Sequence, residues 1–148
     1  LYIGSEVYIN GISKVLKQIE KFNINNLKLC GTNFLYLLKS LKIRTIDEIY
    51  VINPDPWPKK RHNKRRLLNR DNLLSMNSLL KEEGKIFIST DSENYFDEIK
   101  LAISTENQFD KVIYGCMSDS DDMYGISNYQ KKAISKQQDI YKIEIFRN

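Results

Sequence analysis

The sequence predicts an α/β fold with a mostly parallel sheet. Short apolar and β-branched runs alternate with stretches in which apolar residues recur at helical spacing, and this alternation is typical of such folds. The 148 residues, of which 41% are hydrophobic, are enough to bury one core. We therefore expect a single domain over residues 1–148.

The first part of the chain is expected to form a β-α-β unit. Residues 1–4 look like the end of a strand, and the apolar residues between Ile12 and Phe22 recur at helical spacing. Residues 27–30 form a short apolar run that ends at a glycine. The leucines between residues 34 and 41 then predict a second helix.

The remaining sequence continues this alternation. The β-branched run over residues 46–52 predicts a buried strand, and residues 85–90 predict another strand after Gly84. We expect helices over residues 67–80 and 95–103, and two closing strands over residues 109–114 and 140–146.

The most informative segment of the sequence runs from Asn53 to Arg66. It contains all three prolines of the chain, its one tryptophan and its one histidine. Each proline fixes its own φ and favours an extended residue before it, so Asp55 is expected in one rigid pose just after the strand over residues 46–52. Because ligands bind at the carboxyl ends of strands in open α/β sheets, this loop is a candidate site.

Much of the excess positive charge of the chain lies between Lys59 and Arg66. The formal net charge is +4, and a local group of cations suggests a polyanionic partner. The alternative interpretation is that lysines reflect a biased genome composition and that charged runs form solvated surfaces. That alternative explains scattered lysines better than it explains this cluster.

Other features narrow the class of protein. Cys30 and Cys116 are far apart and lack metal-ligand spacing, so we expect two small buried residues in a reducing compartment and no metal site. No run approaches the ~18 apolar residues of a membrane span, and no signal peptide opens the sequence. These observations favour a cytoplasmic protein without a membrane partner.

Four short motifs resemble one known family. They read DPWPKKRH at 55–62 followed by KRR at 64–66, GKIF at 84–87 leading into TDSENY at 90–95, IGSEV at 3–7, and SNYQ at 127–130. Together they resemble the bacterial tRNA (guanine-N7)-methyltransferases, which transfer a methyl group from S-adenosylmethionine to a guanine in the tRNA variable loop. The resemblance implies a Rossmann-like class I methyltransferase sheet, mostly parallel with an antiparallel last strand, and a tRNA partner.

The resemblance assigns Glu6, Asn33 and Asp55 to the cofactor. Glu6 would accept hydrogen bonds from both ribose hydroxyls. Asn33 would contact the adenine, at a position where the family commonly has Asp, and Asp55 would lie between the cofactor and the base. Without the resemblance, Glu6 reads as a solvated acid before a helix and Asn33 as a turn residue.

The resemblance also assigns Asp55, Lys59 and Asp91 to the guanosine, with Asp55 as the catalytic residue. The N7 atom of guanine has an in-plane lone pair and no proton, so the reaction needs positioning and no general base. Without the resemblance, Asp91 reads as the N-cap of the helix that follows it, and this role is compatible with a contact to the guanosine. Three further residues are implied to close over the substrate: Ser127, Tyr129 and Gln130, the last at a position where the family has Glu.

The resemblance implies that a cluster of basic residues contacts the tRNA. Phosphate contacts by these cations would make binding depend on salt. Trp57 could stack on a base, although a lone tryptophan more often anchors its own loop. The implied RNA-binding residues are Arg61, His62, Lys64, Arg65 and Arg66.

One feature of the family is absent from the sequence. These methyltransferases open with a strand and a Gly-rich turn near the methionine part of the cofactor, and no GxGxG sequence occurs here. We expect the first strand, missing from this chain, to come from an upstream segment of the same polypeptide or from a partner chain. The alternative is a catalytically inactive remnant that acts as an RNA-binding module, but the acids Glu6, Asp55 and Asp91 favour the enzyme.

Overall fold

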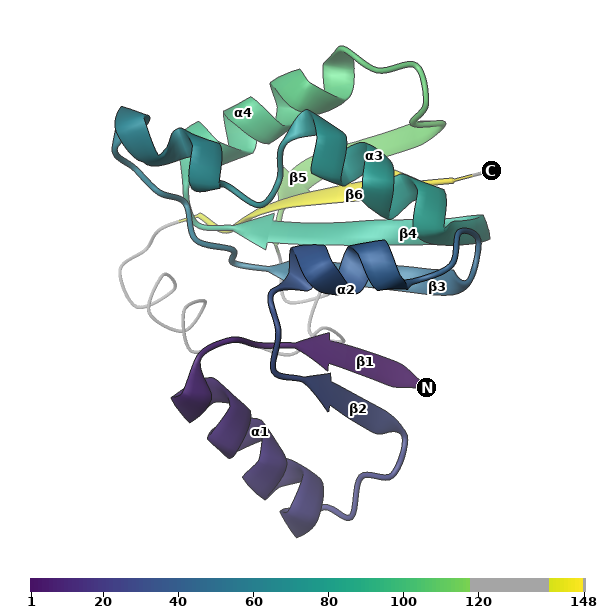
Figure 1. Cartoon of the computed structure of the whole chain (residues 1–148). Helices are drawn as coiled ribbons and strands as arrows, with labels where there is room; N and C mark the ends of the chain where they lie inside the picture. Colours follow the sequence, from purple (N-terminus) through teal and green to yellow (C-terminus); the bar gives the residue numbers. More distant parts are fainter. Residues whose placement is uncertain (118–138, 148) are drawn as a thin grey trace. The chain divides into compact units, whose positions relative to one another are not determined.

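Strands and helices alternate along the chain, as the sequence predicts. The computed structural model describes residues 1–117 and 139–147, and its elements run from β1 to β6 (Figure 1). The chain divides into two compact units, Leu1–Lys42 and Ile43–Asn148, and each unit is described by itself. The expectation of one domain over residues 1–148 stays a prediction.

The first unit is the predicted β-α-β arrangement followed by a second helix. The two strands pair in parallel, from Tyr2 opposite Leu27 to Ser5 opposite Cys30. Leu38 is the one buried residue of this unit. The elements are β1 (Tyr2–Ser5), α1 (Ile9–Lys21), β2 (Leu27–Cys30) and α2 (Phe34–Ser40).

The second unit contains a four-stranded sheet in its described part, and α3 and α4 cover one face of that sheet (Figure 1). A 3₁₀ helix, η1, follows the first strand of the unit. The elements are β3 (Ile46–Ile52), η1 (Lys60–Arg65), α3 (Arg70–Leu79), β4 (Leu80–Thr90), α4 (Glu93–Ser104), β5 (Lys111–Cys116) and β6 (Tyr141–Phe146).

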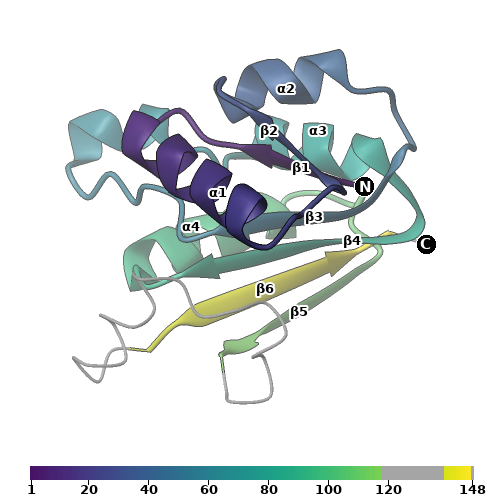
Figure 2. The same ribbon diagram turned by 90° about the horizontal axis from the view of Figure 1, so that it is seen from below.

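The order of strands in this sheet is β3-β4-β6-β5, so the last strand in sequence lies inside the sheet (Figure 2). β3 and β4 are parallel, whereas β6 is antiparallel to both β4 and β5. The prediction of a mostly parallel sheet with an antiparallel last strand is therefore confirmed.

The core of the second unit lies between this sheet and its two helices. The strand β4 contributes Ile86, Phe87 and Ile88, all fully buried, and the antiparallel strand adds Ile143 and Ile145. Each helix also contributes buried side chains to this core: Leu73 and Met76 from α3, and Tyr95 and Ile99 from α4. Burial of this kind holds the strand ends rigidly and so fixes the loops that leave them.

Some predicted element boundaries are wrong. The third helix begins at Arg70 and not at residue 67, because Asn69 caps it by accepting a hydrogen bond from the Asn72 N–H at 3.1 Å. The last-but-one strand begins at Lys111 and not at residue 109.

The strand β4 begins at Leu80, earlier than the predicted start at residue 85. Its first part is irregular, with Glu83 at a φ of 63°. A Cβ atom on Gly84 would lie 2.9 Å from the carbonyl oxygen of Lys81, so this position requires glycine. The glycine marks an irregularity within the strand and not the turn before it.

The two cysteines are free thiols, and neither is fully buried. Cys30 is half-buried at the end of β2, but Cys116 is exposed. The prediction that both are buried is therefore wrong, most clearly for Cys116, because it ends β5, which is an edge strand of the sheet. Within residues 1–117 and 139–147, no helix is long and apolar enough to cross a membrane.

Candidate functional site

Two aspartates follow neighbouring parallel strands of the second unit. Ile52 at the end of β3 lies opposite Ser89 of β4, and the Asn53 N–H donates a hydrogen bond to the Ser89 carbonyl at 2.9 Å. The segments that follow β3 and β4 therefore leave the sheet side by side. Asp55 and Asp91 follow at this edge, both exposed, and neither carboxylate makes a hydrogen bond or ion pair with the described residues.

The turn that carries Asp55 has a constrained backbone. Prolines occupy positions 54, 56 and 58, and two residues adopt left-handed φ values, 46° at Asn53 and 42° at Trp57. Asn tolerates this conformation, whereas a bulky residue such as Trp carries strain of about 1–3 kcal/mol unless its surroundings impose it. The structure must therefore hold the Trp57 backbone in place.

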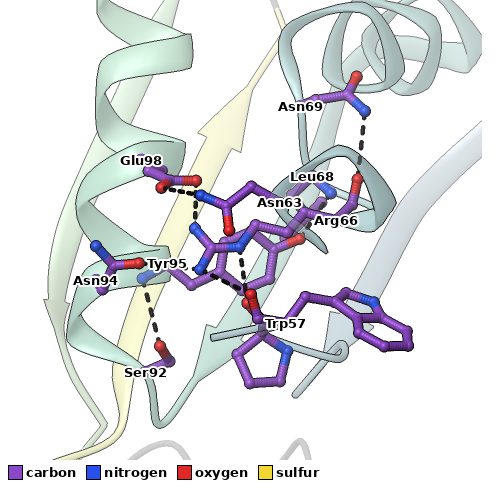
Figure 3. A network of polar contacts seen from close by, with 10 residues as sticks. Trp57, Asn63, Arg66, Leu68, Asn69, Ser92, Asn94, Tyr95 and Glu98 are labelled. Atoms are coloured by element: carbon purple, nitrogen blue, oxygen red, sulfur yellow. Dashed lines mark hydrogen bonds and ion pairs between the residues drawn. The ribbon is translucent and has the colours of Figure 1, made fainter. Parts of the chain in front are cut away.

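Arg66 provides much of this restraint (Figure 3). Its Nε atom donates a hydrogen bond to the Pro56 carbonyl at 2.7 Å, and Nη2 lies 3.5 Å from the Trp57 carbonyl oxygen. On its other side, Nη2 donates to Asn94 Oδ1 at 2.9 Å and Nη1 forms an ion pair with Glu98. The guanidinium thus joins the turn after Asp55 to the helix α4.

Arg66 differs from the cations around it because it is buried, with 4% of the residue exposed. Its guanidinium carbon also lies 4.9 Å from the centre of the Tyr95 ring. A side chain enclosed in this way presents no surface to a phosphate. The contacts of Arg66 lie within the loop and with α4, so its position adds no support to the implied phosphate contact, which stays a prediction.

Tyr95 packs against the Arg66 guanidinium and connects the segment at Leu68 to this network. Its hydroxyl oxygen accepts a hydrogen bond from the Leu68 N–H at 2.8 Å, and the residue is fully buried. Burial raises the pKa of Tyr95 to about 12, so the hydroxyl stays neutral at physiological pH. Asn63 adds a further link, because its Nδ2 atom donates to Glu98 at 3.1 Å.

Asp91 is not the N-cap of α4, which corrects one interpretation of the sequence. The cap is Ser92, whose Oγ atom accepts a hydrogen bond from the Tyr95 N–H at 3.4 Å. The Ser92 N–H in turn donates to Thr90 Oγ1 at 3.2 Å. These contacts fix the backbone on both sides of Asp91 and leave its carboxylate available.

The remaining cations of the loop are exposed on η1 and just before it. Arg65 lies over Trp57, with its guanidinium carbon 5.1 Å from a ring centre of the indole. The His62 ring contacts the same side chain edge-on, at 5.7 Å between centroids and 87° between planes. These contacts favour the interpretation that Trp57 anchors its own loop. The exposed cations are Lys59, Lys60, Arg61, Lys64 and Arg65.

The first unit brings Glu6 and Asn33 to one edge of its own sheet. They follow β1 and β2, whose ends pair through Ser5 and Cys30, and the Glu6 N–H donates to the Cys30 carbonyl at 3.1 Å. Parallel strands place their carboxyl ends at the same edge, so these two polar side chains share it. Each also contacts the start of a helix, Asn33 as the N-cap of α2 and Glu6 through its carboxylate beside α1.

The Glu6 carboxylate lies against the first turn of α1. Its Oε1 atom accepts a hydrogen bond from the Tyr8 N–H at 2.8 Å. A Cβ atom on Gly11 would lie 2.8 Å from Oε2, so the absence of a side chain at Gly11 makes room for the carboxylate. Oε2 and the second lone pair of Oε1 remain as acceptors, which fits a pair of neighbouring hydroxyls.

Asn33 uses half of its amide within the chain. Its Oδ1 atom caps α2 by accepting a hydrogen bond from the Leu35 N–H at 2.9 Å. Its Nδ2 atom makes no hydrogen bond to the described residues. The amide can therefore donate to an acceptor nitrogen of a purine while it caps the helix.

Some of the predicted site residues cannot be placed. Ser127, Tyr129 and Gln130 lie outside the described residues. Sequence reasoning missed Asn94 and Glu98, although their four-residue spacing puts them on one face of α4, where a single side chain can contact both.

The architecture is that of the Rossmann-like methyltransferases. The chain is similar to an rRNA methylase from Streptococcus thermophilus, with a TM-score of 0.65 and 9% identity over 98% of this chain and 72% of that one. It is also similar to a 30S ribosomal A1408 methyltransferase from an uncultured bacterium, with a TM-score of 0.63 and 19% identity over 100% of this chain and 76% of that one. The predicted fold class is confirmed.

The particular family follows from the sequence comparisons. Residues 1–143 match the family described as "Putative methyltransferase", and the chain belongs to it. It is 33% identical to a tRNA (guanine-N(7)-)-methyltransferase of Wolbachia pipientis, over the whole chain and 66% of that protein. It is 40% identical to a bifunctional methyltransferase of Rickettsia bellii, over 74% of this chain and 20% of that protein. The predicted resemblance is confirmed, and the chain spans a small part of the length of the Rickettsia relatives.

Proposed function

We propose that this chain forms part of an enzyme that transfers a methyl group from S-adenosylmethionine to the N7 atom of a guanine in the tRNA variable loop. The observation that carries the proposal is a pair of carboxylates, Asp55 and Asp91, which have no partner among the described residues and lie at neighbouring strand ends beside a loop of exposed cations. The names of two relatives support methylation of a tRNA guanine at N7. A tRNA substrate would place the activity in the cytoplasm.

The first unit would bind the adenosine part of the cofactor. Glu6 offers acceptors for the two ribose hydroxyls, and Asn33 offers an N–H donor for a ring nitrogen of the adenine. S-adenosylmethionine supplies the electrophilic methyl group. We propose that the Gly-rich element for its methionine part comes from an upstream segment of the same polypeptide or from a partner chain, because no GxGxG sequence occurs here.

The second unit would position the base. The guanine N1–H and exocyclic amino group are donors, and carboxylates are acceptors for both, so Asp55 and Asp91 can hold the ring with N7 directed at the methyl group. N7 carries no proton, so no general base is required. Correct alignment of reacting groups can supply about 7–11 kcal/mol, and the two carboxylates also favour the positive charge that the product base acquires. Lys59, exposed at the start of η1, would contact the guanosine.

The exposed cations of η1 would bind the tRNA backbone. Arg61, Lys64 and Arg65 lie on the surface of the loop that carries Asp55, with His62 half-buried among them. Each phosphate that a cation neutralises releases a counterion, so affinity falls as salt rises. Ser127, Tyr129 and Gln130 stay predicted substrate contacts.

A tRNA with 7-deazaguanosine tests the reaction at the level of one atom. This analogue replaces N7 by a C–H group and keeps the N1–H and amino donors. We expect the full-length protein to methylate the unmodified tRNA, and to bind but not methylate tRNA that carries the analogue in the variable loop. Methylation of the substituted tRNA at an unchanged rate would refute the proposed target atom. Binding of tRNA without binding of S-adenosylmethionine would instead support an inactive RNA-binding module.

A further inference from the structure

We propose that Arg66 is a positioning residue that fixes the Asp55 turn relative to Asp91 by joining the turn to the first half of α4. This inference rests on the proposed function, because it concerns how the two carboxylates are held at the same site. It assigns Arg66 a role distinct from that of the exposed cations on the same loop.

The contacts of Arg66 reach both sides of the site. On one side it contacts the carbonyl oxygens of Pro56 and Trp57, the two residues that directly follow Asp55. On the other side it contacts Asn94 and Glu98 of α4 (Figure 3). One guanidinium thus connects the backbone of the turn to the side chains of the helix.

The same helix holds Asp91. Ser92, the residue after Asp91, caps α4 through the Tyr95 N–H, so the position of Asp91 follows from the position of the first helical turn. Asn94 lies in that turn and accepts a hydrogen bond from Arg66 at 2.9 Å. Both carboxylates are therefore tied to α4, Asp91 through its neighbouring cap and Asp55 through Arg66.

The geometry requires an arginine. A guanidinium presents five N–H donors in a planar fork, which can serve acceptors on opposite sides at once. A lysine ammonium at the same place could contact fewer of the four partners. The same contacts hold the strained φ of 42° at Trp57. Arg66 contacts the carbonyl oxygens of Pro56 and Trp57, which belong to the two carbonyl groups at the ends of this torsion.

The charge of Arg66 is already neutralised within the protein. The side chain is 3% exposed, whereas that of its ion-pair partner Glu98 is 41% exposed. A phosphate would have to displace Glu98 and reach a buried group. Removal of this positive charge is therefore expected to leave the number of tRNA phosphate contacts unchanged.

Trp57 offers a reporter that does not depend on activity. It is the one tryptophan of the chain, its carbonyl oxygen contacts Arg66, and its indole contacts both His62 and Arg65. Its fluorescence emission and anisotropy therefore report the conformation of the Asp55 turn directly.

The test compares Arg66→Gln with Lys64→Gln in the full-length protein, because the two substitutions remove the same charge from neighbouring positions. For Arg66→Gln we expect turnover at saturating tRNA to fall about 10²-fold, as for a misplacement of about 1 Å, with lower Trp57 anisotropy and an unchanged salt slope of tRNA binding. For Lys64→Gln we expect unchanged Trp57 emission and a salt slope smaller by about 0.7–0.9, the value for one phosphate.

A second variant covers the case in which Arg66→Gln does not fold. Asn94→Ala removes one acceptor from an exposed position of α4, and we expect it to lower Trp57 anisotropy and turnover with no change in salt slope. The proposal is overturned if Arg66→Gln reduces the salt slope as much as Lys64→Gln does, or if both Arg66→Gln and Asn94→Ala leave Trp57 fluorescence unchanged. A wild-type protein that methylates no tRNA would refute the proposed function, whereas the fluorescence and salt measurements would still decide what Arg66 does.

Discussion

Removal of the Asp55 carboxylate should stop methylation without disturbing the fold. The side chain is exposed and makes no hydrogen bond or ion pair with the described residues, so Asp55→Ala should change the free energy of unfolding by no more than about 0.5 kcal/mol. In the proposed complex the carboxylate accepts up to two hydrogen bonds from guanine. Each such bond to a charged group contributes about 1.5–3 kcal/mol.

The loss of both bonds would remove about 3–6 kcal/mol of transition-state stabilisation. Since 1.36 kcal/mol corresponds to a tenfold change, the rate of methyl transfer should fall by about 10²–10⁴-fold. A single-turnover assay with radiolabelled S-adenosylmethionine measures this rate, and filter binding measures tRNA affinity, which should stay within about threefold of wild type because the phosphate contacts remain.

The matched control is Asp47→Ala. Asp47 is an exposed aspartate at the opposite end of β3, and it accepts a hydrogen bond from Lys81 Nζ at 2.7 Å. We expect the Asp47→Ala substitution to leave the rate of methyl transfer unchanged. The reasoning is refuted if Asp55→Ala weakens tRNA binding as much as it slows methyl transfer, or if both aspartate variants slow the reaction equally.

Two further substitutions test residues that lie beside the proposed site residues. Tyr95→Phe keeps the ring but leaves the buried Leu68 N–H without its acceptor, so the free energy of unfolding should fall by about 1–3 kcal/mol in denaturant titration; an unchanged midpoint would contradict this hydrogen bond. Gly11→Ala should weaken S-adenosylmethionine binding in calorimetry, because its Cβ atom would lie 2.8 Å from Glu6 Oε2. Ser13→Ala, on the same helix, is its control, and equal affinities for the two variants would argue against a cofactor role of Glu6.

The elements that the sequence predicts correctly are those set by local patterns. The β-branched run over residues 46–52 forms β3, and the prolines after it place Asp55 at the carboxyl end of that strand. The start of α3 is harder to predict from the sequence. Leu67 and Leu68 continue the apolar spacing of the helix, whereas the cap at Asn69 determines where the helix begins.

The burial of Arg66 could not be predicted from its neighbours in sequence. Lys64 and Arg65 are exposed cations, and the run of three basic residues looks uniform. Arg66 is buried because its partners Asn94 and Glu98 come from α4, far along the chain. Only tertiary packing brings them together, so no local pattern distinguishes this arginine from the two before it.

The strand order of the second unit also constrains the moment at which its sheet can close during synthesis. β6 follows β5 in sequence but lies between β4 and β5, and it pairs with both. On the ribosome, β5 therefore leaves the exit tunnel before the strand that joins it to the rest of the sheet. Ile143 and Ile145 of β6 are fully buried, so until they emerge the nascent chain exposes one edge of β4 together with the apolar surface that they later cover. The sheet of this unit therefore cannot be completed during synthesis until β6 is available to pair with both neighbours.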